Sequence, residues 1–236
     1  MSNSFFRFKQ FTIEQDGCAM KVGTDGCLLG SWFNCAHSKR ILDIGCGTGL
    51  ISIMAAQRCN AHITGVEIDS DAARKAAENV GNCRWHKRIE IKNADIFKFE
   101  PDGKYDTIVS NPPYFVNSMK CDDSSRTLAR HSDSMQSDRF FHRAKELLST
   151  DGRVSVIIPQ DIRDEWCEAA CNFGFFPSRI AYIKTTPRKV PKRVLIEFSQ
   201  KGNLEVEENC IVLETSPGVY SDEARMLLRD FYLKIE

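Results

Sequence analysis

The 236-residue chain lacks the segments that mark secreted, membrane-spanning or metal-cluster proteins. No apolar run approaches the roughly 18 to 20 residues that cross a bilayer. The N-terminal region shows no positively charged stretch followed by an apolar segment and a small-residue cleavage site. The ten cysteines are scattered and include no Cys-x-x-Cys pair. These absences predict a cytoplasmic protein with reduced thiols, no membrane partner and no metal site.

A surplus of charge is also missing, because 32 Lys and Arg residues balance 32 Asp and Glu residues. This balance excludes a protein that coats nucleic acid by bulk charge. It is uneven along the chain, however. Residues 184–201 hold six cations and one acid, whereas residues 203–236 hold eight acids and three cations. The basic segment suits phosphate contacts, and a solvated basic loop is the alternative.

Short apolar runs alternate with amphipathic segments from Arg40 onward. The expected strands cover 41–44, 63–66, 89–91, 105–110, 154–158, 180–184 and 193–198. The expected helices cover 50–58, 70–80, 138–148, 161–172 and 221–233, with Ser70 and Asp71 as an N-cap pair and Asp151-Gly152 closing the third. This alternation predicts an α/β fold with a Rossmann-like, mostly parallel sheet and helices on both faces.

Two β-prone runs flank Asp16-Gly17 near the start of the chain. Asp-Gly between such runs is a strong signal for a tight turn, so we expect a hairpin within residues 5–22. Residues 27–33 then form an apolar stretch that predicts one or two helical turns.

A glycine-rich turn connects the first expected strand of the sheet to its helix, where residues 43–49 read Asp-Ile-Gly-Cys-Gly-Thr-Gly. Glycines there permit a tight turn and close approach of the backbone to a ligand. Glu67 follows about twenty residues later, where a carboxylate can accept hydrogen bonds from both hydroxyls of a ribose. A glycine-rich turn alone can be a plain connection, but the pair indicates a cofactor that contains adenosine.

The third glycine comes one residue too early for the dinucleotide fingerprint, and the acidic Asp43 precedes the turn. The stretch resembles motif I of the class I S-adenosylmethionine-dependent methyltransferases. That resemblance implies S-adenosylmethionine as cofactor and a seven-stranded sheet whose final strand is antiparallel. It also implies cofactor contacts from Asp43, Gly45, Gly47, Gly49, Glu67, Ile68, Asp95 and Asn111.

A second motif, Asn111-Pro112-Pro113-Tyr114, follows the expected strand 105–110. Two prolines cannot continue a strand ladder, so they fix an extended loop at the edge where open α/β sheets bind ligands. The plain alternative is a strand terminator next to an ordinary aromatic residue. The tetrapeptide resembles the Asn/Asp-Pro-Pro-Phe/Tyr motif of amino-group methyltransferases.

The motif's residue types suit methylation of a conjugated nitrogen, whose lone pair is delocalised and therefore a poor nucleophile. The Asn111 side-chain oxygen and the Pro112 carbonyl can accept its N–H groups and favour the charge that develops during attack. Tyr114 offers a face for stacking a planar base. Asn111, Pro112 and Tyr114 are therefore the expected catalytic residues.

The same tetrapeptide occurs in adenine-N6 and guanine-N2 methyltransferases and in enzymes that modify a protein glutamine. Residues 20–32 decide among them, because they resemble the N-terminal motif of the family that methylates N6 of adenine 37, beside the anticodon of a valine tRNA. The resemblance implies cofactor contacts from Lys21, Thr24 and Asp25. Transfer to N5 of a protein glutamine, or to a base of rRNA, is the alternative.

The expected partner is therefore tRNA, bound by a monomeric enzyme. Residues 126–131 also resemble that family. The substrate contacts expected from the loops are Pro113, Arg126, Arg130, His131, Arg188, Lys189, Lys192 and Arg193. We expect a single methyltransferase domain over 1–236, with a hairpin and cofactor-covering segment at 1–36 and a catalytic core at 37–236.

Overall fold

An eight-stranded sheet forms the centre of the structure, a computed structural model that describes residues 3–18, 21–113, 136–202 and 205–235. Its strands are β3 (Arg40–Ile44), β4 (His62–Glu67), β5 (Ile89–Asn93), β6 (Tyr105–Ser110), β7 (Leu148–Pro159), β8 (Phe176–Lys184), β9 (Arg193–Ser199) and β10 (Glu207–Val212). Their spatial order is β10-β8-β9-β7-β6-β3-β4-β5. Only β9 runs antiparallel to its neighbours, β7 and β8.

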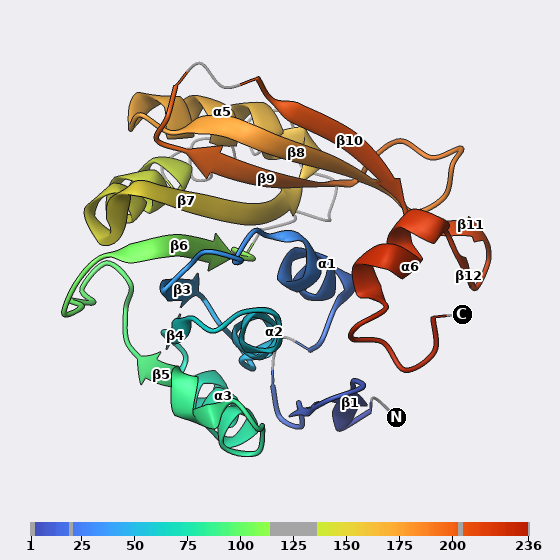
Figure 1. Cartoon of the computed structure of the whole chain (residues 1–236), viewed down its shortest axis with the longest axis horizontal. Helices are drawn as coiled ribbons and strands as arrows, with labels where there is room; N and C mark the ends of the chain where they lie inside the picture. The colour runs from blue at the N-terminus through green and yellow to red at the C-terminus, as the bar shows by residue number, and fades with distance from the viewer. Residues whose placement is uncertain (1–2, 19–20, 114–135, 203–204, 236) are drawn as a thin grey trace, which may run out of the picture.

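Helices cover both faces of this sheet (Figure 1). They are α1 (Thr24–Trp32), α2 (Leu50–Arg58), α3 (Ser70–Gly81), a helix over 136–147, α5 (Arg163–Asn172) and α6 (Asp222–Leu228), with single 3-10 turns at η1 (His86–Arg88) and η2 (Gln160–Ile162). None of the helices in the described segments is long and apolar enough to span a membrane.

Two hydrophobic cores lie on opposite faces of the sheet. Ile41 packs in the core shared with α1 and α2, whereas the adjacent Leu42 packs in the core shared with α5 and the helix over 136–147. Both side chains are fully buried. Burial on both faces explains why the central strands are continuous apolar runs, and it confirms the predicted mostly parallel α/β sheet.

The sheet has one strand more than the resemblance implied. β9 is the expected antiparallel strand, and β10 adds an eighth that pairs in parallel with β8 at the sheet edge. Sequence reasoning missed β10 because four successive residues, Glu207 to Cys210, are exposed and only Ile211 is buried. An edge strand with one buried residue shows no apolar alternation.

The N-terminal hairpin exists, but its turn was predicted at the wrong place. β1 (Phe5–Arg7) pairs with β2 (Thr12–Glu14), and the Phe8 N–H donates to the Phe11 carbonyl at 2.9 Å. The Phe8 and Phe11 rings stack with centroids 4.5 Å apart, and both side chains are buried. Aromatic burial therefore decides the register, and Asp16-Gly17 forms a separate turn after the hairpin.

Three boundaries also differ from the predictions. Asp69, rather than Ser70 or Asp71, caps α3 by accepting the Ala72 N–H at 2.8 Å. The helix over 136–147 passes directly into β7, so Asp151-Gly152 lies inside the strand. The last helix ends at Leu228 rather than at residue 233.

The N-terminal hairpin packs on the C-terminal segment that follows α6. The Lys9 N–H donates to the Phe231 carbonyl at 2.8 Å, and the Lys9 ammonium donates to the Arg229 carbonyl at 2.6 Å. Gln57 on α2 donates to the Asp230 carbonyl at 2.9 Å. Figure 1 shows the two ends on the same side of the molecule. A second small hairpin, β11 (Glu214–Ser216) with β12 (Val219–Tyr220), precedes α6.

Candidate active site

A cavity of about 820 Å³ opens at the carboxyl ends of β3, β4, β5 and β6. Parallel strands bring the loops that follow them to this one edge, which is where open α/β sheets bind ligands. The sequence-predicted residues that line the cavity are Gly45, Gly47, Glu67, Ile68, Asp95, Asn111, Pro112 and Pro113. Two separately predicted motifs, the glycine-rich turn and the Asn-Pro-Pro segment, therefore share one cavity.

The glycine-rich turn forms one wall. Gly45 and Gly47 have φ angles of 69° and 55°, in the left-handed region that other residues rarely adopt. A Cβ at either position would meet nothing within 4 Å, so the turn leaves open space for a ligand. Gly49 has a different role, because a Cβ there would lie 3.4 Å from Ala76 Cβ. It permits close packing of α3 and does not line the cavity.

Glu67 connects the glycine-rich turn to the residues that follow β4. Its Oε2 accepts the Gly47 N–H at 2.9 Å, and its Oε1 accepts the Asp69 N–H at 3.0 Å. Each carboxylate oxygen can accept a further hydrogen bond, so the group can also receive ribose hydroxyls. The N–H groups of Gly47 and Asp69 therefore fix the orientation of the Glu67 carboxylate before any ligand binds.

Apolar side chains lie beside Asp95 where β5 ends. Ile68 and Phe97 both line the cavity, and Ile68 is 70% exposed. An apolar side chain with this much exposed surface can pack against the face of a planar base. Asp95 accepts the Phe97 N–H at 3.0 Å through Oδ1, which fixes the carboxylate next to these apolar surfaces.

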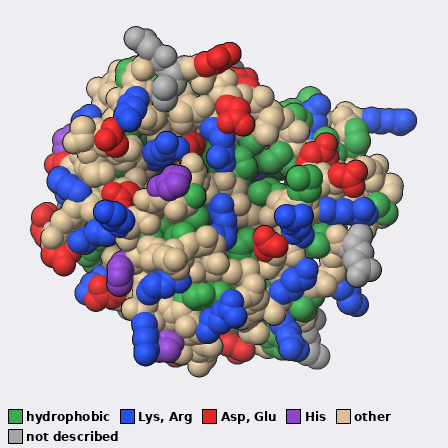
Figure 2. Space-filling model, viewed as in Figure 1, with side chains coloured by type: hydrophobic (Ala, Val, Ile, Leu, Met, Phe, Trp, Pro, Cys, Tyr) green, Lys and Arg blue, Asp and Glu red, His purple; other side chains and the backbone are tan. Residues whose placement is uncertain are grey.

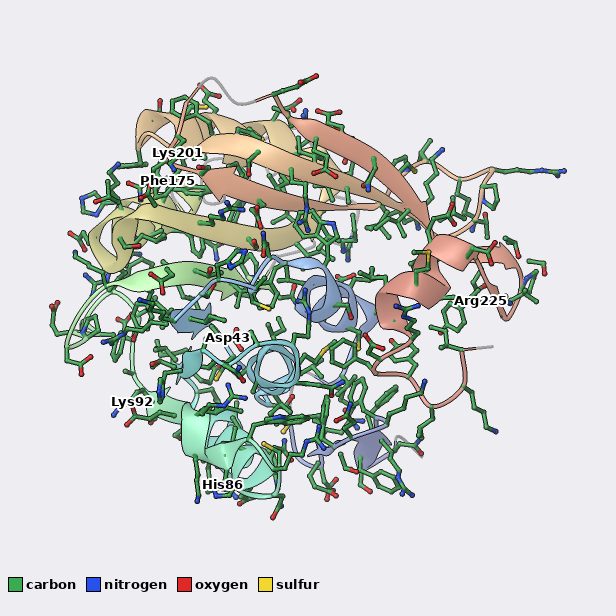
Figure 3. All side chains as sticks on the ribbon, in the orientation of Figure 1. Asp43, His86, Lys92, Phe175, Lys201 and Arg225 are labelled. Carbon is green, nitrogen blue, oxygen red and sulfur yellow. The ribbon has the colours of Figure 1, made fainter. Side chains whose placement is uncertain are left out.

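Asp43 lies in the interior of the fold, at the end of β3 (Figure 3). It is fully buried and accepts the Ser52 hydroxyl at 2.7 Å through Oδ2. Its Oδ1 has no hydrogen-bond partner among the residues that the structure describes. Burial away from water raises the pKa of Asp43 to about 7, and the Glu67 charge adds to the shift.

Asp43 directly precedes the lining residues Ile44 and Gly45. A buried carboxylate oxygen without a partner fits a ligand that carries a positive charge, because such a group would offset the cost of ionisation. The ammonium and sulfonium groups of S-adenosylmethionine meet this requirement.

The N-terminal cofactor contacts expected at Lys21, Thr24 and Asp25 do not line the cavity. Asp25 Oδ2 instead accepts a hydrogen bond from Arg193 Nε at 2.8 Å. Arg193 was expected to contact the substrate. Asp25, the expected cofactor contact, and Arg193, the expected substrate contact, thus form an ion pair with each other.

Sequence reasoning missed part of the wall. Phe97, Phe140 and Trp166 line the cavity, as do Gly17 and Cys18 from the segment after the hairpin. Phe97 follows Asp95 by two residues and could have been found from that spacing. Phe140 and Trp166 lie on helices far away in sequence, and no local pattern indicates them.

Arg139 and Arg143 lie on the helix over 136–147. Arg139 lines the cavity, with its guanidinium 4.1 Å from the centroid of the Phe97 ring. Arg143 is buried, donates to the Ile96 carbonyl at 2.9 Å and pairs with Glu146 at 2.6 Å. Its hydrogen bond to Ile96 therefore joins the loop after β5 to this helix. Tyr114, Arg126, Arg130 and His131 lie outside the described residues.

The basic segment forms the connection between β8 and β9. Arg188, Lys189 and Lys192 are exposed in it. Because β8 runs parallel to β7, this connection lies at the same sheet edge as the cavity. Figure 2 shows Lys and Arg side chains interspersed with Asp and Glu over the visible face, in keeping with the zero net charge. The cations of this loop are close together in the sequence, and the strand directions place them at the carboxyl edge of the sheet.

Comparisons with known proteins agree with this geometry. The family model of the methyltransferase small domain matches residues 18–166. The tRNA1(Val) (adenine(37)-N6)-methyltransferase of Bacteroides fragilis strain NCTC 9343 is 47% identical over 100% of both chains. That of Trichodesmium erythraeum is 43% identical over 99% of this chain and 100% of its own. The chain belongs to this methyltransferase family.

Solved structures share the methyltransferase fold. A predicted O-methyltransferase of Agrobacterium tumefaciens superposes with a TM-score of 0.71 at 20% identity, over 90% of this chain and 99% of its own. A glycopeptide N-methyltransferase in complex with S-adenosyl-L-methionine gives 0.54 at 12% identity, over 77% and 90%. As a member of the family, the chain is a methyltransferase enzyme, and its cofactor is S-adenosylmethionine. Among the described residues, no cluster of three or more His, Cys, Asp or Glu could hold a metal ion.

The buried Asp43 carboxyl predicts a pH dependence of stability. Because the pKa of Asp43 is higher in the folded than in the unfolded chain, its contribution to the free energy of unfolding falls as the pH rises from about 4 to about 7. Between pH 5 and pH 8, the cofactor-free protein should lose roughly 2 to 3 kcal/mol of unfolding free energy relative to Asp43→Asn. Urea denaturation of both proteins at the two pH values measures the difference. Equal pH dependence in the two proteins would contradict the assignment.

Proposed function

We propose that this chain transfers a methyl group from S-adenosylmethionine to N6 of adenine 37 in tRNA1(Val). The observation that carries the proposal is that Asn111, Pro112 and Pro113 line the same cavity as the glycine-rich turn and Glu67. The acceptor is supported by curated relatives of that name, which are 41% to 47% identical over nearly the whole chain.

The Asn-Pro-Pro segment provides the chemistry that an exocyclic amine requires. Asn111 is half-buried and Pro112 is buried at the end of β6. Ser110 fixes this end, because its hydroxyl donates to the Ile44 carbonyl of β3 at 2.9 Å. The Asn111 side-chain oxygen and the Pro112 carbonyl would accept the two N6 hydrogens. They would orient the lone pair and stabilise the positive charge that develops on the nitrogen.

The residues around the rest of the cavity suit the cofactor. Glu67 would hold the ribose, and Asp95 with Ile68 would hold the adenine. Asp43, Gly45 and Gly47 would surround the amino-acid part. S-adenosylmethionine supplies an electrophilic methyl group when bound.

The N-terminal region would act as a cover for this cavity. We assign residues 1–36 to a hairpin and covering segment and residues 37–236 to the catalytic core of one domain. The proposal rests on Gly17 and Cys18, which line the cavity although they precede the sheet. Lys21, Thr24 and Asp25 follow this segment in the sequence, and we assign cofactor contacts to them as the family motif implies.

The tRNA would approach the carboxyl edge of the sheet. Pro113 is exposed beside the cavity, and Arg188, Lys189 and Lys192 are exposed on the loop at that edge. We assign phosphate contacts to these cations and to Arg193, with Arg126, Arg130 and His131 contacting the substrate and Tyr114 stacking on the base. An anticodon-loop base needs little energy to leave its stack, so a single domain can reach it.

The acceptor is tested with transcripts of the valine tRNA that carry adenine or guanine at position 37. The purified protein should form N6-methyladenosine only in the first, as measured by mass spectrometry of digested nucleosides. Methylation of both transcripts, or of protein alone when a cell extract is offered with radiolabelled cofactor, would contradict the proposal.

The Asn111 side chain should be required for transfer, whereas its contribution to cofactor binding should be small. Asn111→Ala removes an acceptor aimed at the reacting nitrogen, so kcat should fall at least about 100-fold. The dissociation constant for S-adenosylmethionine, measured by calorimetry, should change less than about threefold. Asn60→Ala, which truncates an exposed asparagine, is the matched control. Turnover that survives in Asn111→Ala would disprove this role.

The basic loop should determine affinity for tRNA. Replacing Arg188, Lys189 and Lys192 together by Ala should raise the KM for tRNA about tenfold or more and weaken its dependence on salt. Removing Lys39, Lys87 and Lys201 is the matched control, because it takes the same charge from the opposite edge of the sheet. An equal rise of KM in the two triple variants would show that bulk charge, and not the loop, binds tRNA.

A further inference from the structure

One buried amide on α3 connects two walls of the cofactor cavity. Asn79 is 1% exposed. Its Nδ2 donates to the Glu14 carbonyl and to the Thr48 carbonyl, both at 3.0 Å, and its Oδ1 accepts the Glu14 N–H at 2.9 Å. Both donors and the acceptor are used. The other residues on the buried face of α3 are Ala73, Ala76 and Val80, so this amide is the polar exception on an apolar face.

The first wall that Asn79 reaches is the segment after the N-terminal hairpin. Glu14 ends β2, and the chain continues from it to Gly17 and Cys18, which line the cavity. Gln15 joins the two ends of this segment, because the oxygen of its buried side-chain amide accepts the Val22 N–H at 2.9 Å. The Asn79 amide pairs with both backbone groups of Glu14, as a neighbouring strand would. The position of Gly17 and Cys18 over the cavity therefore depends on this pairing.

The second wall is the glycine-rich turn. Thr48 lines the cavity, and its carbonyl accepts from Asn79. The adjacent Gly47 donates its N–H to Glu67. Neighbouring residues of the turn are thus held by two side chains, a carboxylate from the end of β4 and an amide from α3. Glu67 fixes the turn to the sheet, and Asn79 fixes it to the covering segment.

We propose that Asn79 is a positioning residue for the cofactor. It holds residues 14–18 and the glycine-rich turn at a fixed separation, so that both walls of the cavity are formed before S-adenosylmethionine enters. A buried amide is retained here because an apolar side chain would leave the Glu14 and Thr48 backbone groups unpaired. The inference rests on the cofactor of the family and not on the tRNA acceptor.

Two substitutions test the proposal. Asn79→Leu keeps the approximate volume and removes all three hydrogen bonds. Asn79→Asp keeps the shape and the acceptor for the Glu14 N–H but removes both donors, and it serves if the Leu variant does not fold. In each, the dissociation constant for S-adenosylmethionine should rise about tenfold. The kcat at saturating cofactor and the KM for tRNA should stay within about threefold, because the acceptor groups at Asn111 and Pro112 are untouched.

Val80→Ala is the control for a purely structural effect. It removes buried methyl groups from the adjacent position of α3 and lowers stability, but it removes no side-chain hydrogen bond to Glu14 or Thr48. Calorimetry with S-adenosylmethionine alone, on variants whose folding is checked by circular dichroism, gives the readout. Unchanged cofactor affinity in the Asn79 variants, or an equal loss in Val80→Ala, overturns the proposal. Wild-type protein that binds the cofactor but does not methylate tRNA would contradict the proposed acceptor and leave this test intact.

Discussion

The hydrogen bond from the Gly47 N–H to the Glu67 carboxylate is the interaction on which the site depends. It joins the loops that follow two neighbouring parallel strands, β3 and β4. The sheet register places these loops side by side, since Ile44 pairs with Val66. Burial of both sheet faces fixes that register, because a slip by one residue would move Ile41 and Leu42 to the wrong cores. The geometry of the chemical site thus follows from hydrophobic packing some distance below it.

The sequence predicts best the elements whose environment is uniform along their length. β6 and α2 have the expected boundaries because strands buried on both faces and helices on the core show clear apolar patterns. Predictions fail where a distant contact decides. The Phe8 and Phe11 stacking moves the hairpin turn, and the Asp25 pair with Arg193 joins residues 168 positions apart. Local patterns carry no information about such partners.

The positions of individual cations matter more in this protein than its net charge of zero. The exposed cations of the loop between β8 and β9 lie at the same sheet edge as the cavity, while Arg143 is held by carbonyl and carboxylate partners. A nearly neutral enzyme with a few correctly placed cations can leave its product readily, because non-specific binding to other RNA stays weak. The position of a single charge matters in the same way at Asp43, whose buried carboxyl lies where a positively charged ligand group is expected.

The contact between the N-terminal hairpin and the C-terminal segment has a consequence for the order of events during synthesis. Lys9 binds carbonyl groups of Arg229 and Phe231, and the hairpin leads into the residues that line one side of the cavity. The hydrogen bonds of Lys9 can form only after residue 231 has left the ribosome, which is later than the first strands of the sheet appear. The cavity lining at Gly17 and Cys18 thus follows a hairpin whose position depends on a contact between residues 220 positions apart in the sequence.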